Sequence, residues 1–167
     1  MQGKYHFACG VAGGAILAAT FYQYFESPIL DSATVVIGSC LGSLIPDIDS
    51  PTSAIGTIVK PISKLINKAF GHRTITHSGL WLIPLILMLS KMPSGLLFGY
   101  IGGYFGHLLS DTLTKGGVPW FYPLKRKRYK LSRIRSGDGD GVLTVLSLVI
   151  MLSLNIAVRY FIDNNFS

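Results

Sequence analysis

The chain has 167 residues, of which 49% are hydrophobic and only 14% are charged, and its mean hydropathy is +0.46. Soluble domains average roughly 25% charged residues, so this composition indicates a protein that lipid solvates in part. The net charge of +7 does not indicate a nucleic-acid-binding protein, because Lys and Arg lie in segments between apolar runs instead of covering a polar face. The sequence therefore predicts one membrane-embedded domain over residues 1–167, with membrane lipids and their anionic head groups as partners.

Apolar residues are concentrated in five stretches, each of which is expected to form a helix. They cover residues 7–25, 32–46, 79–92, 94–113 and 142–162. The first and last approach the ~20 residues that a membrane helix needs, whereas the second and third are shorter. The predicted fold is all-α, with about five transmembrane helices. A mostly soluble bundle with fewer membrane anchors is the alternative.

Glycines recur four residues apart within these stretches. Small residues at this spacing allow apolar helices to approach each other closely, so the pattern predicts a tightly packed bundle. The pairs are Gly38 with Gly42, Gly99 with Gly103, and Gly102 with Gly106.

The basic residues predict the orientation of the chain. If the N-terminus is cytoplasmic, the segments 1–6, 47–78 and 114–141 lie inside and hold thirteen of the fifteen Lys and Arg residues. Basic residues favour the cytoplasmic side, so the N-terminus is predicted inside and the C-terminus outside. Residues 1–19 are alternatively a signal peptide, with Lys4 before an apolar core.

A short amphipathic helix is predicted between residues 55 and 70. Apolar residues recur there at helical spacing, and Lys60, Lys64 and Lys68 form a row four residues apart. The helix is expected either to lie on the membrane surface with its lysines toward phosphate groups or to cover the bundle. The basic segment 125–135, KRKRYKLSRIR, is expected to attract anionic lipid, with substrate binding as the alternative.

All four histidines and several acidic residues fall near the predicted cytoplasmic ends of the apolar stretches. Ionisable groups at membrane depth are costly and usually functional. His107 and Asp111 are four residues apart and project from one helical face, whereas His72 and His77 need a turn between them. Imidazole and carboxylate ligands without thiolates suit Zn²⁺, Mn²⁺ or Fe²⁺. The predicted metal ligands are His6, Asp47, Asp49, His72, His77, His107 and Asp111.

These candidates exceed the four ligands of one tetrahedral zinc, so one or two divalent ions are predicted, zinc before manganese or iron. Pairs of ions about 3.5–4 Å apart are common in phosphoesterases. Arg73 is expected to hold a phosphate, and Asp49 or Asp111 to act as general base. The predicted catalytic residues are therefore Asp49, Asp111 and Arg73. Taken singly, each of these side chains would be an ordinary helix cap or a hydrogen-bonded buried group.

This combination of motifs resembles the bacterial YdjM-like family, which is classed as membrane-bound metal-dependent hydrolases and is sometimes called LexA-regulated. The matching segments are His6, LIPDID at 44–49, AFGHRTITHS at 69–78 and GYFGHLLSDTLTKGGVPWFYP at 103–123. The resemblance implies a multi-pass inner-membrane protein with a metal-dependent hydrolase site, and kinship with zinc-dependent phospholipase C and P1-type nucleases. The family pattern carries over to His6, Asp47, Asp49, His72, Arg73, His77, His107 and Asp111.

The chain departs from the family pattern in two places. Ser50 follows PDID, where some relatives have a histidine. Before the last apolar stretch, Asp138 or Asp140 stands where relatives tend to carry a glutamate. The ligand sphere of this chain is therefore expected to differ in detail.

The predicted function is a metal-dependent phosphoesterase at the cytoplasmic membrane face, acting on a phospholipid or lipid-linked phosphate. The alternative is a metal transporter or sensor that binds an ion without hydrolysis. A transporter is expected to hold its ion near the middle of the membrane. The candidate ligands here lie at the ends of the apolar stretches, which favours an interfacial enzyme.

Overall fold

A computed structural model describes residues 3–132, 134–135 and 137–165. Within them the regular elements are helices, apart from one isolated bridge between Val118 and Tyr129, so the all-α prediction is confirmed for this part of the chain. The α-helices are α1 (Gly3–Phe21), α2 (Pro28–Leu44), α3 (Ala54–Ile58), α4 (Lys60–Phe70), α5 (Leu82–Lys91), α6 (Gly95–Thr112) and α7 (Asp140–Asn165). The 3₁₀ turns are η1 (Tyr22–Tyr24), η2 (Ile45–Asp49), η3 (Ile75–His77) and η4 (Gly79–Trp81).

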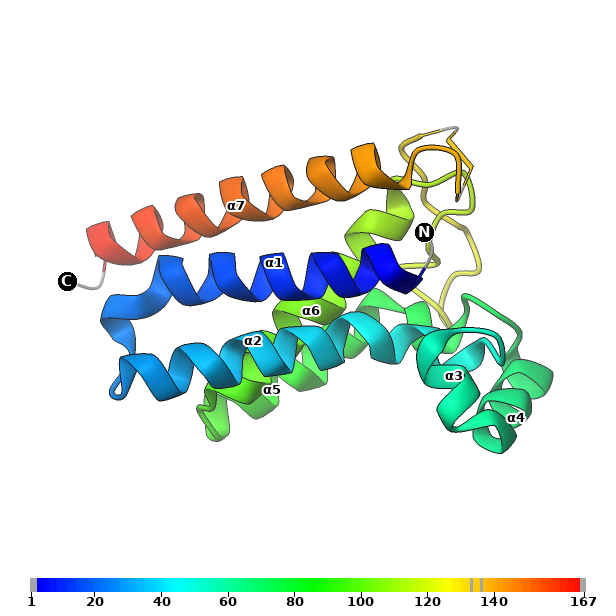
Figure 1. Cartoon of the computed structure of the whole chain (residues 1–167), viewed down its shortest axis with the longest axis horizontal. Coiled ribbons are helices and arrows are strands. Elements are labelled where there is room, and N and C mark those ends of the chain that lie inside the picture. Colours follow the sequence, from blue (N-terminus) through cyan, green and yellow to red (C-terminus); the bar gives the residue numbers. More distant parts are fainter. Residues whose placement is uncertain (1–2, 133, 136, 166–167) are drawn as a thin grey trace.

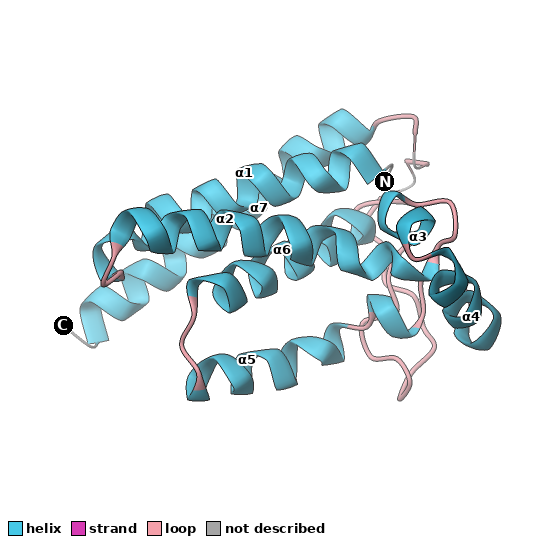
Figure 2. Ribbon diagram, turned by 60° about the horizontal axis from the view of Figure 1, so that its bottom comes forward, coloured by secondary structure: helices cyan, strands magenta, loops and turns pink. Residues whose placement is uncertain are grey.

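The long helices lie side by side along the long axis of the molecule (Figure 1). Helix α6 contacts α1, α2, α5 and α7, and α5 lies at the outer edge of the bundle beside α6 (Figure 2). The N-terminal end of α1, the α3–α4 pair and the segment between α6 and α7 all lie at one end of the molecule. The C-terminal end of α7 lies at the other (Figure 1).

The prediction of about five membrane spans is wrong in number. Three helical segments of the described chain are long and apolar enough to cross a membrane: Gly3–Tyr24, Pro28–Asp49 and Asp140–Asn165. Helix α5 has 10 residues, about half of what a span needs. Helix α6 is long enough but rich in glycine, and it carries the buried residues His107 and Asp111. Neighbouring helices therefore shield much of it.

Helices α2 and α6 touch backbone to backbone through the predicted glycine pairs. A Cβ added to Gly38 or Gly42 would meet a carbonyl oxygen of α6 at 2.0 or 2.1 Å. One added to Gly99 or Gly103 would meet a carbonyl oxygen of α2 at 2.0 Å. Real Cβ atoms do not approach so closely, so any larger residue would push the two helices apart.

Side chains of α1 and α7 close around another face of α6. The third predicted pair, Gly102 and Gly106, faces Leu17 of α1 and Met151 of α7 instead of a backbone. Leu17 and Met151 are themselves 5% and 3% exposed. Helix α6 is therefore a central helix whose polar residues can be held away from both water and lipid.

The predicted amphipathic helix is divided into α3 and α4. The chain turns at Val59, and Pro61 lies in the first turn of α4, where it costs no helical hydrogen bond. Ile62 and Leu65 of α4 are 53% and 68% exposed, so much of its apolar side does not cover the bundle.

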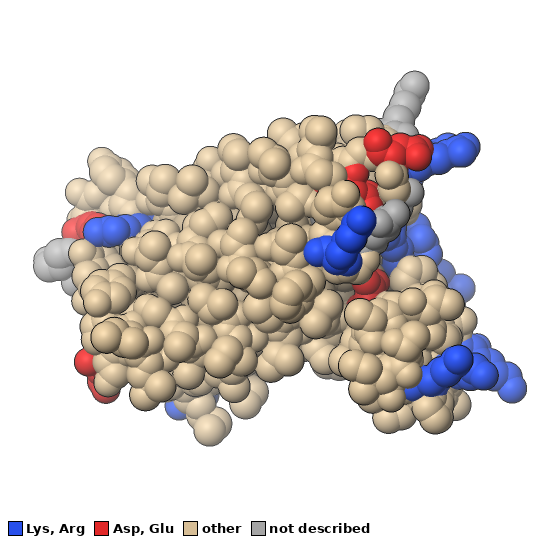
Figure 3. All heavy atoms as spheres, in the orientation of Figure 1, with Lys and Arg blue, Asp and Glu red and all other residues tan. Residues whose placement is uncertain are grey.

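Charged side chains gather at the two ends of the molecule and leave an uncharged belt between them (Figure 3). The lysines of α4 and most described basic residues of the loop after α6 lie at the end that holds the N-terminus. The belt includes strongly exposed apolar residues such as Leu87 and Val149, at 62% and 54%. Such a belt suits contact with lipid chains. Arg133, one of the basic residues of the predicted inner segments, lies outside the described residues.

Candidate metal centre

All seven predicted ligands come together at the end of the bundle that carries α3 and α4. They are His6 on α1, Asp47 and Asp49 on η2, His72 and His77 on the following loop and η3, and His107 and Asp111 on α6. Their ligand atoms fall into three overlapping groups, each within 4.8 Å. The groups are His6 with His107 and Asp111, Asp47 with His77 and His107, and Asp47 with Asp49 and His72.

Four of these residues form a compact central quartet: Asp47, His77, His107 and Asp111. The Nε2 atoms of His77 and His107 are 3.3 Å apart. Asp47 Oδ1 lies 3.6 and 3.8 Å from these two nitrogens, and Asp111 Oδ2 lies 3.6 and 3.7 Å from them. Ligand atoms around a tetrahedral zinc, each at ~2.0–2.1 Å from it, are ~3.3 Å apart. These five distances are therefore close to the spacing of ligand atoms around one such ion.

Hydrogen bonds orient two of the buried histidines so that Nε2 faces the quartet. His107 Nδ1 donates to Ser43 O at 2.6 Å. Ser110 Oγ donates to His107 O, so it accepts from His6 Nδ1 at 3.1 Å. A histidine whose Nδ1 carries the proton keeps a lone pair on Nε2, which is the usual arrangement of a metal-ligating imidazole.

His77 is oriented in the same way by the loop on which it lies. Thr76 Oγ1 donates to Asp49 Oδ2 at 2.6 Å and therefore accepts from His77 Nδ1 at 3.1 Å. Burial would lower the pKa of His77, but the neighbouring Asp47 and Asp49 and the charge of Asp111 raise it above its ordinary value. The carboxylates thus make the site favourable for a positive charge.

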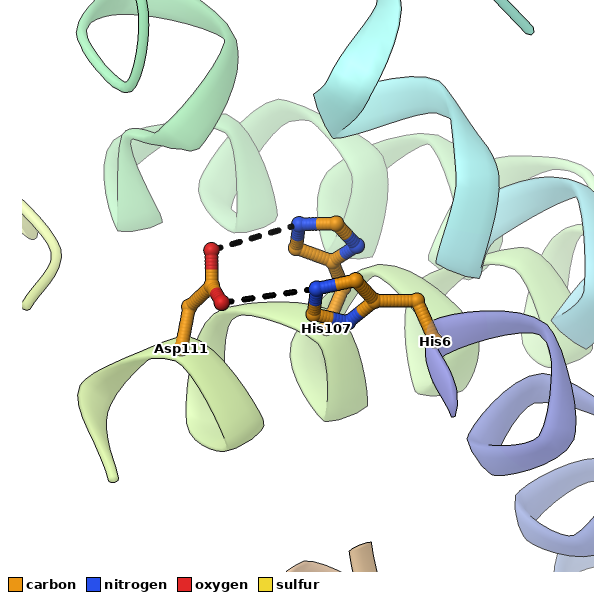
Figure 4. A group of neighbouring side chains, drawn as sticks. All are labelled: His6, His107 and Asp111. Carbon is orange, nitrogen blue, oxygen red and sulfur yellow. Dashed lines mark ion pairs between the residues drawn. The ribbon is translucent and has the colours of Figure 1, made fainter. Parts of the chain in front are cut away.

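His6 lies beside the quartet on the α1 side. Its ring stacks on that of His107 with centroids 3.8 Å apart, and the two rings face the two oxygens of Asp111 (Figure 4). His6 Nε2 is 3.4 Å from Asp111 Oδ1. It is buried and has no hydrogen-bond partner among the described residues. Buried polar atoms are normally satisfied, so an Nε2 directed at carboxylates fits a cation between them.

Asp49 holds the loop 71–78 in place. Its Oδ1 accepts from His72 Nδ1 at 2.7 Å, and its Oδ2 accepts from Arg73 N at 2.8 Å as well as from Thr76. Both oxygens of this fully buried carboxylate are thus occupied. His72 lies further out, with its side chain 43% exposed. An ion held by the group that contains Asp49 and His72 would compete with these hydrogen bonds.

Arg73 connects the loop to α6. It has a φ of 56°, in the left-handed region, which costs a residue other than glycine ~1 kcal/mol. This conformation directs its backbone N–H to Asp49, while its Nη2 donates to Asp111 Oδ1 at 2.9 Å. Arg73 also lines a cavity of about 370 Å³ together with Arg126 and Arg128.

Ser43, Thr76 and Ser110 are absent from the predicted site although they orient its histidines. Ser43 acts through its carbonyl oxygen, which no side-chain pattern can indicate. Asp140 Oδ1 instead accepts from Gly137 N at the start of α7. Asp140 belongs to none of the metal-binding groups found among the described residues, and neither does Asp138.

Comparisons with known proteins place the chain in a family. A family profile described as "YdjM inner membrane protein" matches residues 1–165. "Inner membrane protein YdjM" of Escherichia coli (strain K12) is 40% identical over an alignment of 128 residues, and the match covers 70% of this chain and 65% of that relative. "Uncharacterized protein YvsG" of Bacillus subtilis (strain 168) is 34% identical over 125 residues, 74% of each chain. No solved structure is significantly similar.

The profile match includes every predicted metal ligand, from His6 to Asp111. The chain matches a little under two thirds of the length of the Escherichia coli protein, 65%. The profile match and the apolar helices agree with a location in the bacterial inner membrane. We conclude that the chain belongs to the YdjM inner membrane protein family.

Proposed function

We propose that the protein is a metal-dependent hydrolase that cleaves phosphate esters at the cytoplasmic face of the inner membrane. The observation that carries this proposal is the central quartet, in which the two imidazole nitrogens lie 3.3 Å apart and each of the two carboxylate oxygens lies 3.6–3.8 Å from both nitrogens. Neutral imidazole and carboxylate donors suit zinc, and manganese or iron accept the same donors. A second ion is also part of the proposal, because two further groups could hold it: His6 with His107 and Asp111, and Asp47 with Asp49 and His72.

A bound divalent ion would polarise a phosphoryl oxygen and lower the pKa of a water molecule. In the proposed hydrolysis the water oxygen forms a bond to phosphorus, and the bond from phosphorus to the leaving alcohol breaks. One water proton ends on the alcohol oxygen and the other is released from the phosphate product. Asp49 and Asp111 are the two carboxylates proposed for the role of general base: Asp49 accepts three hydrogen bonds, and Asp111 has Oδ1 on Arg73 and Oδ2 in the quartet.

The guanidinium of Arg73 supplies a fixed positive charge beside the quartet. Its Nη2 is 2.9 Å from Asp111 Oδ1, and its side chain is only 12% exposed. Arginine donors bind phosphate oxygens in pairs, and their effect is largest where water is excluded. Arg73 is therefore proposed to hold the phosphate and to offset the charge that develops on it.

The position of the site supports an interfacial enzyme over a transporter. The quartet lies where α2 and α6 end and where α1 and α7 begin, at one end of the molecule (Figure 1). A transporter would hold its ion near mid-depth. Basic residues surround this same end, which by the positive-inside rule supports a cytoplasmic location for it. The α5–α6 hairpin starts and finishes there, so the corrected number of spans leaves this orientation unchanged.

Helix α4 supports contact of this end with lipid head groups. Its exposed Ile62 and Leu65 lie beside its exposed Lys64 and Lys68. A helix with apolar and basic exposed sides lies at a membrane surface with its lysines toward phosphate.

A hydrolysis assay tests the proposal. Purified protein, loaded with zinc, is given a chromogenic phosphate monoester and diester, and the same assay follows after chelation. We expect release of the chromophore to require the ion and to fall at least about a hundredfold in Arg73→Ala, the size of effect typical for one electrostatic stabiliser. Folded, metal-loaded protein that releases no more chromophore than His107→Ala would contradict hydrolysis and favour the transporter or sensor.

A further inference from the structure

We propose that the ligand of this site is a single amphiphile that occupies two adjoining cavities, with its phosphate group in a basic cavity and its hydrocarbon chain in an apolar one. This inference rests on the proposed function, because it names the class of substrate for the same metal centre. It commits to a phosphate that carries a long chain, as in a membrane lipid.

The basic cavity has a volume of about 370 Å³ and lies beside the metal centre. Three arginines from two segments line it: Arg73 from the loop before α5, and Arg126 and Arg128 from the loop after α6. Arg73 touches Asp111, and Arg128 Nη2 donates to His72 O at 3.3 Å. Several guanidinium groups around one space are suited to a phosphate dianion, since each offers paired N–H donors in a fixed plane.

The apolar cavity has a volume of about 270 Å³ and lies between α4, α5 and α6. Its lining includes Ile66, Leu85 and Trp81. Two of its aromatic residues use their polar groups elsewhere: Tyr104 OH donates to Thr76 O, and Trp81 Nε1 donates to Ile75 O. The surface that remains for a ligand is therefore hydrocarbon and aromatic, which suits an alkyl chain.

One short segment separates the two cavities. Phe70 lines both. Arg73 and Thr74 line the basic cavity, whereas Ile75 and Thr76 line the apolar one. A ligand that fills both cavities would therefore have its charged group on the Arg73 side of this segment and its chain on the Thr76 side, as a lipid phosphate could.

The same segment is bound to the metal centre on both of its sides. On the basic side Arg73 Nη2 donates to Asp111, and on the apolar side Thr76 Oγ1 donates to Asp49. A phosphate among the arginines would consequently lie next to the quartet. Trp81 is 49% exposed and Phe70 is 46% exposed, so the apolar cavity can be reached from the surface of the molecule.

Fluorescence quenching by brominated probes measures binding without turnover. The full chain is kept in an amphipathic polymer, to avoid detergent chains, and is treated with chelator so that no hydrolysis occurs. The probe is 12-bromododecyl phosphate, and 12-bromododecanol is the same chain without the phosphate. Trp81 reports on the apolar cavity, and Trp81→Phe identifies its share of the signal, because the chain has two tryptophans.

We expect the phosphate probe to quench Trp81 at a concentration roughly tenfold or more below that of the alcohol. Arg126→Gln combined with Arg128→Gln should remove most of this difference and leave quenching by the alcohol unchanged. Lys127→Gln is the matched control, since Lys127 is exposed and lines neither cavity. Ile66→Phe, which fills the apolar cavity, should weaken both probes.

Two results would overturn the proposal. Equal quenching by both probes would mean that the dodecyl chain of each probe merely partitions into an apolar surface of the protein. Inorganic phosphate that displaces the probe at the probe's own concentration would mean that the site takes free phosphate. Failure of the proposed function gives a different result: the expected quenching pattern with no hydrolysis by zinc-loaded protein leaves the two-cavity site intact. Hydrolysis of the chromogenic esters together with equal quenching by the two probes overturns the amphiphile alone and leaves the proposed function intact.

Discussion

Single hydrogen bonds decide what the buried histidines of this protein can bind. His6, His77 and His107 each use Nδ1 as a donor to an oxygen, which leaves Nε2 as an acceptor aimed at Asp47 or Asp111. Without a cation this arrangement would be destabilising, because the buried Nε2 acceptors of three histidines would face carboxylate oxygens, which are acceptors too. These hydrogen bonds thus hold the donor atoms in an arrangement that could bind a metal ion.

Arg73 carries the clearest prediction at this scale. Its φ of 56° favours glycine, so Arg73→Gly should be more stable than Arg73→Ala by ~1 kcal/mol although both lose the contact with Asp111. Thermal unfolding of the two purified variants measures the difference. An alanine variant that melts at or above the glycine variant would show that the left-handed conformation is not kept in solution.

At the residue scale, the sequence could predict which residues form the site. It could not predict which of them face the quartet and which hold the loop in place. The spacing of His107 and Asp111 predicts a shared helical face, and both belong to the quartet. The sequence also predicts Asp49 as a ligand or base, and it belongs to the group with Asp47 and His72, but the three hydrogen bonds by which it holds the loop 71–78 could not be predicted. Those bonds join residues up to 27 positions apart, and no local pattern shows them.

At the scale of elements, the contact between α2 and α6 sets the geometry of the metal centre. Glycines bring the two backbones together, and this brings Ser43 O of α2 within 2.6 Å of His107 Nδ1 of α6. The glycine spacing predicts the close contact. Hydropathy counts could not predict that α6 is enclosed by other helices, since glycine and apolar side chains are common to lipid-exposed and protein-enclosed helices alike. The number of spans was overestimated for this reason.

Substituting alanine for Gly103 tests this role of the contact. Its Cβ would lie 2.0 Å from Ser39 O, so the helices must separate, with a cost of about 1–3 kcal/mol and a loss of bound zinc. Gly141→Ala in α7 is the matched control, because a Cβ there meets nothing within 4 Å. Thermal unfolding and metal content are compared for the two variants. Equal behaviour of both would contradict the account of α2 and α6.

At the scale of the whole molecule, charged side chains lie at the two ends and an uncharged belt lies between them (Figure 3). The metal centre and the basic loops lie at one end, and the C-terminal part of α7 lies at the other (Figure 1). If all three candidate spans cross the membrane, the two chain ends lie on opposite sides, because the α5–α6 hairpin starts and finishes at the metal-centre end. From the positive-inside rule we propose that the metal centre faces the cytoplasm.

Labelling of single cysteines tests this orientation. Cys9 and Cys40 are first replaced by serine, and a cysteine is then introduced as Lys127→Cys or as Asn164→Cys. A membrane-impermeant thiol reagent added to intact cells should label the second variant only, and opened cells should allow labelling of the first. Labelling of Lys127→Cys from outside would reverse the orientation and place the proposed hydrolysis on the outer face.

The metal content of the purified chain is the most direct test of the central claim. Elemental analysis of the native protein should find at least about one zinc, manganese or iron ion per chain. His77→Ala and His107→Ala should each lose it, because both supply an Nε2 to the quartet. His72→Ala should keep it, because His72 lies outside the quartet. Folded native protein that holds no divalent ion after incubation with zinc would contradict the metal centre and, with it, the proposed hydrolase.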